Sequence, residues 1–181
     1  MNIWFTSDHH FGHARIIELA NRPFASVEDM DQEMIRRWNA VVQHGDTVYH
    51  LGDFAFDDHN KYLPHLAGQK RLVLGNHDHS NRVKKAKGWQ TIDDLLHVKV
   101  LGDVQIVLCH YAMRVWRNSH HGALHFYGHS HGTLAGDNQS LDVGVDCWAF
   151  APVSFQEIAM RLLDQPARSE PDHHNPWSKV R

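Results

Sequence analysis

The sequence is poor in cysteine and in long apolar stretches. It has two cysteines, Cys109 and Cys147, in 181 residues. That is too few for a disulfide framework and is typical of a reducing compartment. No apolar run approaches the roughly 20 residues that span a bilayer, and the first residues show no basic segment followed by an apolar run, as a secretory signal would. We therefore expect a cytoplasmic protein without a membrane partner.

The sequence also lacks an excess of positive charge. Its formal net charge is −3, so it has no global basic field that would hold nucleic acid. What it has instead is 18 histidines. Histidine is the commonest metal ligand among side chains and carries protons near neutral pH. Because surface scatter can also raise the count, the positions of the histidines decide what they mean.

The length is enough for one domain with a sizeable core. From residue 164 onward the composition changes to three prolines and many charged residues, which is typical of an extended arm. We therefore predict a domain over residues 1–163 and a polar, proline-rich tail over 164–181.

Short apolar runs alternate with helical patterns in the first half of the chain, which predicts an α/β fold. The clearest helix is 27–42, where Ser26 can cap the first turn and Met30, Met34 and Trp38 recur on one face. Weaker helical patterns cover 13–20, 58–67 and 81–87. The predicted strands are 2–7, 47–52, 71–75, 104–109 and 123–128, with a weaker sixth at 140–146.

Each of the five clear strands ends in polar side chains. In open α/β sheets, ligands bind beyond the carboxyl ends of the strands, so we expect these side chains to share one site, except His9, which alternates away from Asp8 and His10 and should be structural. They are oxygen and nitrogen donors without a thiolate. Such a set suits Mn²⁺, Fe or Zn²⁺ and differs from the four cysteines of a structural zinc site. In chain order they are Asp8, His9, His10, His13, Asp53, Asn76, His77, Asp78, His110, His129 and His131.

The spacing of these residues favours a metal site over isolated turns, although a single stretch such as Gly-Asn-His-Asp is also typical of a turn. Asp8 and His10 are two apart, so extended backbone would point them to one side, and His129 and His131 repeat the spacing. The set exceeds what one four-coordinate metal needs. It fits two metals that share a carboxylate.

The ordered motifs resemble those of the calcineurin-like metallophosphoesterases. They are D-x-H at 8–10, G-D at 52–53, G-N-H-D at 75–78, a lone histidine at 110 and G-H-x-H at 128–131. The segments around them resemble a small bacterial and phage branch of that superfamily. The resemblance implies a four-layer α-β-β-α sandwich of two mixed β-sheets flanked by helices.

The resemblance also implies roles for single residues. One metal would be held by Asp8, His10 and His131, and a second by Asn76, His110 and His129, with Asp53 bridging the two. His77 would protonate the leaving oxygen as Asp78 orients its ring, after in-line attack by a hydroxide that bridges the metals. The implied cofactors are two divalent ions, with Mn²⁺ preferred and Fe, Zn²⁺ or Ni²⁺ as alternatives.

The sequence does not decide which residues contact the substrate. His13 fits either a substrate contact or the first turn of a helix. In the segment 110–122, Arg114, Trp116 and His121 could line a substrate pocket, with Trp116 stacking on a base, or the segment could be a packed surface loop with a buried tryptophan. The basic run 82–87 could steer a polyanion or be a solvated helix face.

Three functions compete. The first is a metal-dependent phosphoesterase that hydrolyses phosphate mono- or diesters, with a small phosphoester or nucleotide as substrate. The second is a metal-dependent DNA or RNA nuclease, which the negative net charge disfavours. The third is a non-catalytic scaffold of the same fold, which would be expected to have lost ligands. The residues leave the natural substrate and the oligomeric state undetermined.

Overall fold

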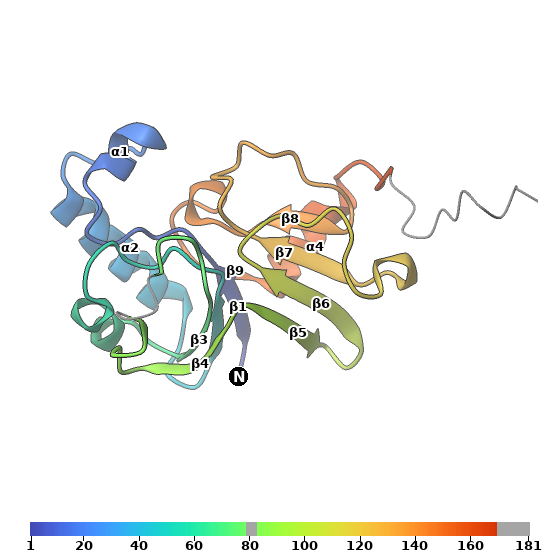
Figure 1. Ribbon diagram of the computed structural model, residues 1–181, viewed down its shortest axis with the longest axis horizontal. Helices are drawn as coiled ribbons and strands as arrows, with labels where there is room; N and C mark the ends of the chain where they lie inside the picture. The colour runs from blue at the N-terminus through green and yellow to red at the C-terminus, as the bar shows by residue number, and fades with distance from the viewer. Residues whose placement is uncertain (79–82, 170–181) are drawn as a thin grey trace, which may run out of the picture.

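Two β-sheets packed face to face form the centre of the protein (Figure 1). The structure is a computed structural model that describes residues 1–78 and 83–169. The first sheet has the strand order β4-β3-β2-β1-β9, with β9 antiparallel to β1 and the other pairs parallel. Its strands are β1 (Ile3–Thr6), β2 (Thr47–His50), β3 (Gln69–Val73), β4 (Trp89–Asp93) and β9 (Val153–Ser154).

The second sheet has the order β5-β6-β7-β8. Its first pair is antiparallel and its other two pairs are parallel. Both sheets are therefore mixed and helices flank them, which confirms the expected fold class. The strands are β5 (Leu95–Val100), β6 (Val104–Cys109), β7 (Leu124–Tyr127) and β8 (Ser140–Asp142).

The long helix forms where the sequence predicts it. The side chain of Ser26 accepts a hydrogen bond from the backbone of Asp29, and Met30, Met34 and Trp38 are buried. No helix in the described ranges is both long and apolar enough to cross a membrane. The helices are α1 (Arg15–Leu19), α2 (Val27–Val41) and α4 (Phe155–Leu163), with short 3₁₀ turns η1 (His59–Lys61), η2 (Leu63–His65), η3 (Ser119–His121) and η4 (Val145–Cys147).

Two weaker helix predictions fare differently. The pattern at 58–67 gives two short 3₁₀ turns instead of one helix, and Pro64 sits in the first turn of the second. Of the predicted helix 81–87, the first two residues lie outside the described ranges. Of the rest, residue 83 is helical, 84 and 85 form a turn, and 87 lies in a bend.

Alternation along β1 divides the apolar side chains between two cores. Phe5 faces the second sheet and packs with Phe126, whereas its neighbour Trp4 packs against the cluster on the α2 side that includes Trp38. Strand β1 is thus covered on both faces, which fixes its register. On the outer face of the second sheet, Val107 packs against the loop that follows β6.

The carboxyl ends of β1, β2, β3, β6 and β7 meet at one edge of the sandwich. The amide of Asp8 donates to the carbonyl of Gly52 at 2.9 Å, and the amide of Gly128 donates to the carbonyl of His110 at the same distance. A bridge between Ser7 and residue 144 joins the loops of the two sheets. This edge brings together the segments that carry the polar clusters.

The tail prediction is only partly covered by the described residues. Helix α4 ends at Leu163. The next residues run back along the domain, where the carbonyl of Pro166 and the amide of Arg168 bond to Asn138. Residues 170–181 of the predicted tail lie outside the described ranges, as does His79.

Candidate metal centre

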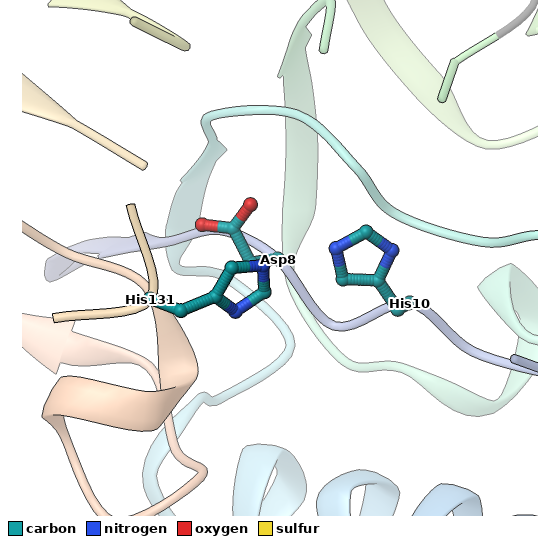
Figure 2. Close-up of side chains that lie close together, drawn as sticks. All are labelled: Asp8, His10 and His131. Atoms are coloured by element: carbon teal, nitrogen blue, oxygen red, sulfur yellow. The ribbon is translucent and has the colours of Figure 1, made fainter. Parts of the chain in front are cut away.

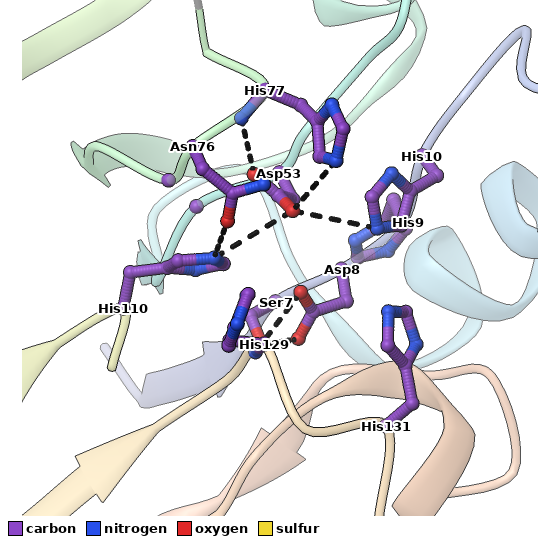
Figure 3. Close-up of polar contacts among 12 residues, drawn as sticks. Ser7, Asp8, His9, His10, Asp53, Asn76, His77, His110, His129 and His131 are labelled. Atoms are coloured by element: carbon purple, nitrogen blue, oxygen red, sulfur yellow. Dashed lines mark hydrogen bonds and ion pairs between the residues drawn. The ribbon is translucent and has the colours of Figure 1, made fainter. Parts of the chain in front are cut away.

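The structure brings six of the seven expected metal ligands into two compact groups. In each group, one ligand atom from every residue lies within 4.8 Å of the others. Figure 2 shows the first group, and Figure 3 shows how the second lies beside it with Asn76. The grouping matches the division implied by the resemblance. The first group is Asp8, His10 and His131, and the second is Asp53, His110 and His129.

Left-handed backbone places most of these ligands. The φ angles are +59° at Asp8, +52° at His10, +55° at Asp53, +67° at His129 and +47° at His131. Such conformations are costly for residues other than glycine, and they gather at functional sites. The extended alternation that we expected for the two pairs is therefore wrong in detail, because tight turns make their side chains converge.

The glycines in the motifs let the chain approach these ligands closely. A Cβ atom on Gly128 would lie 2.1 Å from Oγ of Ser7 and 2.5 Å from Oδ2 of Asp8. A Cβ atom on Gly75 would lie 2.3 Å from Oδ1 of Asp53. Only glycine fits at either position.

The first group has donor atoms that fit a cation. Both ring nitrogens of His10 are buried without a hydrogen-bond partner in the described part of the chain, and its Nε2 lies 3.5 Å from Oδ2 of Asp53. Burial lowers the pKa of His10 far below its usual value, so the ring is neutral. Burial also raises the pKa of Asp8 to about 8. A divalent ion would satisfy the orphaned nitrogen and the carboxylate together.

The second group presents converging lone pairs. Nδ1 of His110 donates to the carbonyl of Leu51 at 2.7 Å, so in the neutral ring Nε2 carries a lone pair. That Nε2 lies 3.1 Å from Oδ1 of Asn76 and 3.6 Å from Oδ2 of Asp53. Three acceptor atoms this close repel one another unless a cation lies between them, so this set also fits a metal.

Asp53 belongs to the second group and also lies next to His10 of the first. Its Oδ2 is 3.5 Å from Nε2 of His10, 3.6 Å from Nε2 of His110 and 4.0 Å from Nε2 of His77. Its Oδ1 accepts a hydrogen bond from the backbone amide of His77 at 2.8 Å. The carboxylate therefore reaches both groups, which is the position a bridging ligand needs.

Two outer partners of the first group were missed from the sequence. Nδ1 of His131 bonds to Oδ2 of Asp146 at 2.7 Å, and the guanidinium of Arg22 donates to both oxygens of Asp146. Metal-bound histidines usually have such a partner on the other ring nitrogen. Arg22 stands in no motif, and Asp146 only ends the weaker predicted strand 140–146, so no local pattern marks them as partners of His131.

The role expected for Asp78 is corrected by the structure. Its Oδ2 accepts from the amides of Asp53 and Gly75 at 2.8 and 2.9 Å, and its Oδ1 accepts from the amide of Phe54 at 3.1 Å. Among the described residues it makes no hydrogen bond to the ring of His77. Asp78 therefore fixes the loops that carry Asp53 and Asn76.

A cavity of about 290 Å³ opens over the two groups. The side chain of His77 is 40% exposed. His13 lies at the same cavity, and its ring stacks on Phe56 with centroids 4.3 Å apart. Helix α1 supplies a wall that the sequence reading missed. The cavity is lined by His10, His13, Ile16, Leu19, Ala20, Asp53, Asn76, His77, His129 and His131.

The expected substrate contacts from the loop 110–122 are absent from the described lining of this cavity. Trp116 is buried, its Nε1 donates to the carbonyl of Ala123 at 2.9 Å, and it packs on Val107. It cannot stack on a base there, so the packed-loop alternative is correct for Trp116. Arg114 and His121 are exposed elsewhere on this loop.

One residue of that loop does reach the centre. Tyr111, which is 46% exposed, has its ring 4.9 Å from the rings of both His110 and His129. In the basic run, Lys84, Lys85 and Lys87 are exposed, and residue 82 lies outside the described ranges.

Comparison with known proteins agrees with this geometry. The model of the calcineurin-like phosphoesterase superfamily domain matches residues 1–152. The chain belongs to the calcineurin-like phosphoesterase superfamily. Membership supports a metal-dependent phosphoesterase in general, and the two ligand groups are consistent with it.

Relatives within the superfamily come from phages, archaea and bacteria. The chain is 28% identical to the Gene 66 protein of Mycobacterium phage L5, over 81% of this chain and 87% of the relative. It is 42% identical to an uncharacterized protein of Methanocaldococcus jannaschii over 42% of this chain and 46% of the relative. A crystal structure of a protein of unknown function from Aquifex aeolicus is similar with a TM-score of 0.70 and 25% identity, covering 88% of this chain and 98% of that one.

Proposed function

We propose that the protein hydrolyses a phosphate monoester or diester at a centre of two divalent metal ions. The observation that carries the proposal is the convergence of both ligand groups on Asp53 below a cavity that also exposes His77. Asp8, His10 and His131 would hold one ion, Asn76, His110 and His129 would hold the other, and Asp53 would be shared between them.

Two divalent ions in these positions supply positive charge to the phosphoryl oxygens and lower the pKa of water. The chain supplies the fixed geometry. Left-handed turns and the carboxylate of Asp78 hold the ligand loops, so little reorganisation is needed when a substrate binds. His10, which burial keeps neutral, offers a lone pair instead of a competing charge.

His77 is the proposed proton donor to the leaving oxygen. Its amide is anchored to Oδ1 of Asp53, whereas its ring projects into the cavity and is partly exposed. Nε2 of His77 lies 4.0 Å from Oδ2 of Asp53, so a group bound over Asp53 comes within reach of it. A histidine so placed can donate a proton to the leaving oxygen.

The size of the cavity favours a small phosphoester over a polymer. A volume of about 290 Å³ lies at the lower end of the range for small-molecule sites. The proposed substrate is therefore a small organic phosphate or nucleotide. Mn²⁺ is the proposed ion, on the chemistry of the oxygen and nitrogen ligands.

The test is an assay with Mn²⁺ on p-nitrophenyl phosphate, bis-p-nitrophenyl phosphate, 2′,3′-cyclic nucleotides and single-stranded DNA. We expect the protein to hydrolyse at least one of the small esters, and we do not expect DNA to be its sole substrate. His77→Ala should lose turnover by about 10²-fold or more and still bind two Mn²⁺. Loss of metal by this variant would contradict the assigned roles, and DNA as the sole substrate would favour a nuclease.

A further inference from the structure

The cavity over the metal centre has two chemically different sides. One side consists of the metal-ligand residues and His77. The other side is formed by helix α1, which presents Ile16, Leu19 and Ala20. A site that bound only a phosphate ion would have no need of an apolar wall beside its metals.

Leu19 is the notable member of this wall. Its side chain is 68% exposed, whereas Ile16 on the same helix is 5% exposed and anchors the helix in the core. Single exposed leucines are common on protein surfaces. This one differs because it lines the cavity that contains His10 and His77.

Backbone hydrogen bonds fix the position of the wall. The amide of Ala20 donates to the carbonyl of Ile16 at 2.9 Å, and the amide of Arg22 donates to the carbonyl of Ile17 at 2.8 Å. Arg22 is itself buried in the ion pair with Asp146. The apolar wall is therefore tied to the same buried network that supports the first ligand group.

An aromatic pair flanks His77 at the cavity. The rings of His13 and Phe56 are stacked within 7° of parallel, and their centroids lie 6.4 and 6.1 Å from that of His77. Phe56 is 45% exposed. His77 thus has two flat ring neighbours, of which His13 also lines the cavity.

We propose that α1 selects phosphoesters whose organic group is apolar and about the size of an aromatic ring, and that this group rests against Leu19 and Ile16. The proposal rests on the proposed function, since the metal centre must hold the phosphoryl end. In this proposal α1, and not Trp116, contacts the organic group of the substrate. Burial of a ring against this wall removes apolar surface from water and so adds affinity.

Two phosphonates test the wall without any need for turnover. Phenylphosphonate and methylphosphonate share one metal-binding group and differ in the ring. We expect calorimetry on the Mn²⁺-loaded protein to give an affinity for phenylphosphonate about tenfold higher than for methylphosphonate. In Leu19→Ser this ratio should fall by about threefold or more, because the exposed serine offers no apolar surface.

The chain offers a matched control. Leu163→Ser changes an exposed leucine at the end of α4 and should leave the ratio unchanged. Leu19→Met keeps an apolar side chain, so it should retain most of the preference for phenylphosphonate. Equal affinities for the two phosphonates in the wild type, or an unchanged ratio in Leu19→Ser, would overturn the proposal. Failure of both phosphonates to bind the metal-loaded protein would instead count against the metal centre itself.

Discussion

The guanidinium of Arg22 and the carboxylate of Asp146 form a buried, two-pronged ion pair. Nε and one terminal nitrogen of Arg22 each lie 2.8 Å from an oxygen of Asp146. The same guanidinium donates to the carbonyls of Asp8 at 2.6 Å and His9 at 2.9 Å. Because Asp146 also accepts from His131, this one pair positions both sides of the first ligand group.

Replacing Arg22 should therefore damage one metal site more than the other. Arg22→Met leaves Asp146 buried beside His131 without its cation, and we expect the free energy of unfolding to fall by about 3 kcal/mol. Mn²⁺ titration by calorimetry should show one weakened site and one nearly unchanged site. Arg22→Lys keeps the charge but not the fork, so it should weaken the same site.

The control for this substitution is Arg36→Met. Arg36 is 67% exposed and pairs with Glu33 on the surface of α2, so both metal sites and stability should change little. Equal weakening of both sites in Arg22→Met would show that the residue supports the fold as a whole and not the first group.

Gly128 should tolerate no side chain. Gly128→Ala places a Cβ atom 2.1 Å from Oγ of Ser7 and 2.5 Å from Oδ2 of Asp8, so the loop that carries His129 must move. We expect a loss of about 1–3 kcal/mol in stability and weaker Mn²⁺ binding. Gly45→Ala has open space around the new atom and serves as the control. A Gly128→Ala protein with wild-type metal affinity would contradict this account.

The substitution Asp78→Asn distinguishes between two roles of Asp78, which are to anchor the ligand loops or to orient the ring of His77. An asparagine cannot accept all three backbone hydrogen bonds made by Asp78, so we expect a loss of about 2 kcal/mol and weaker metal binding through the loops of Asp53 and Asn76. Thermal unfolding and Mn²⁺ titration measure both effects. Asp103→Asn, at a carboxylate that is 97% exposed, is the control. If only the pH–rate profile changed and the metals stayed bound, the ring-orienting role would be right after all.

His125 should make the fold less stable in mild acid. Nδ1 of His125 donates to the carbonyl of Val107, and Nε2 accepts from the amide of Met113. Burial lowers the pKa of His125 from 6.5 to about 4. Between pH 6.5 and 4, His125 is protonated in the unfolded chain but stays neutral in the folded protein. The free energy of unfolding therefore falls as the pH drops from 6.5 to 4.

The size of that effect is about 3 kcal/mol for the full shift. Denaturant unfolding across this pH range measures it. In His125→Gln the dependence on pH should be flatter, and in His44→Gln, at an exposed histidine, it should equal that of the wild type. An unchanged dependence in His125→Gln would show that other buried groups cause the acid sensitivity.

The strand ends were predictable because their pattern is local. An apolar run followed at once by Asp53 or by Asn76 and His77 can be read within a few residues, and the parallel sheet then brings these ends to one edge. The α2 helix was predictable for the same reason, since the Ser26 cap and the spacing of its buried residues are local.

The features that sequence reasoning missed depend on contacts between distant segments. The bond from Arg22 to Asp146 joins residues 124 positions apart, so no local pattern shows that they pair. For Trp116 the sequence left a substrate contact and a packed loop open, and the structure decides between them because Val107 and Ala123 bury it. The apolar wall of α1 becomes visible only when the fold places Leu19 and His10 at the same cavity.

The most direct test of the metal centre is anomalous diffraction from crystals soaked in Mn²⁺. We expect two peaks about 3.5–4 Å apart. One should lie among Asp8, His10 and His131, the other among Asn76, His110 and His129, with Asp53 between them, and Asp53→Asn should weaken both. A single peak, or two peaks that do not share Asp53, would contradict the account.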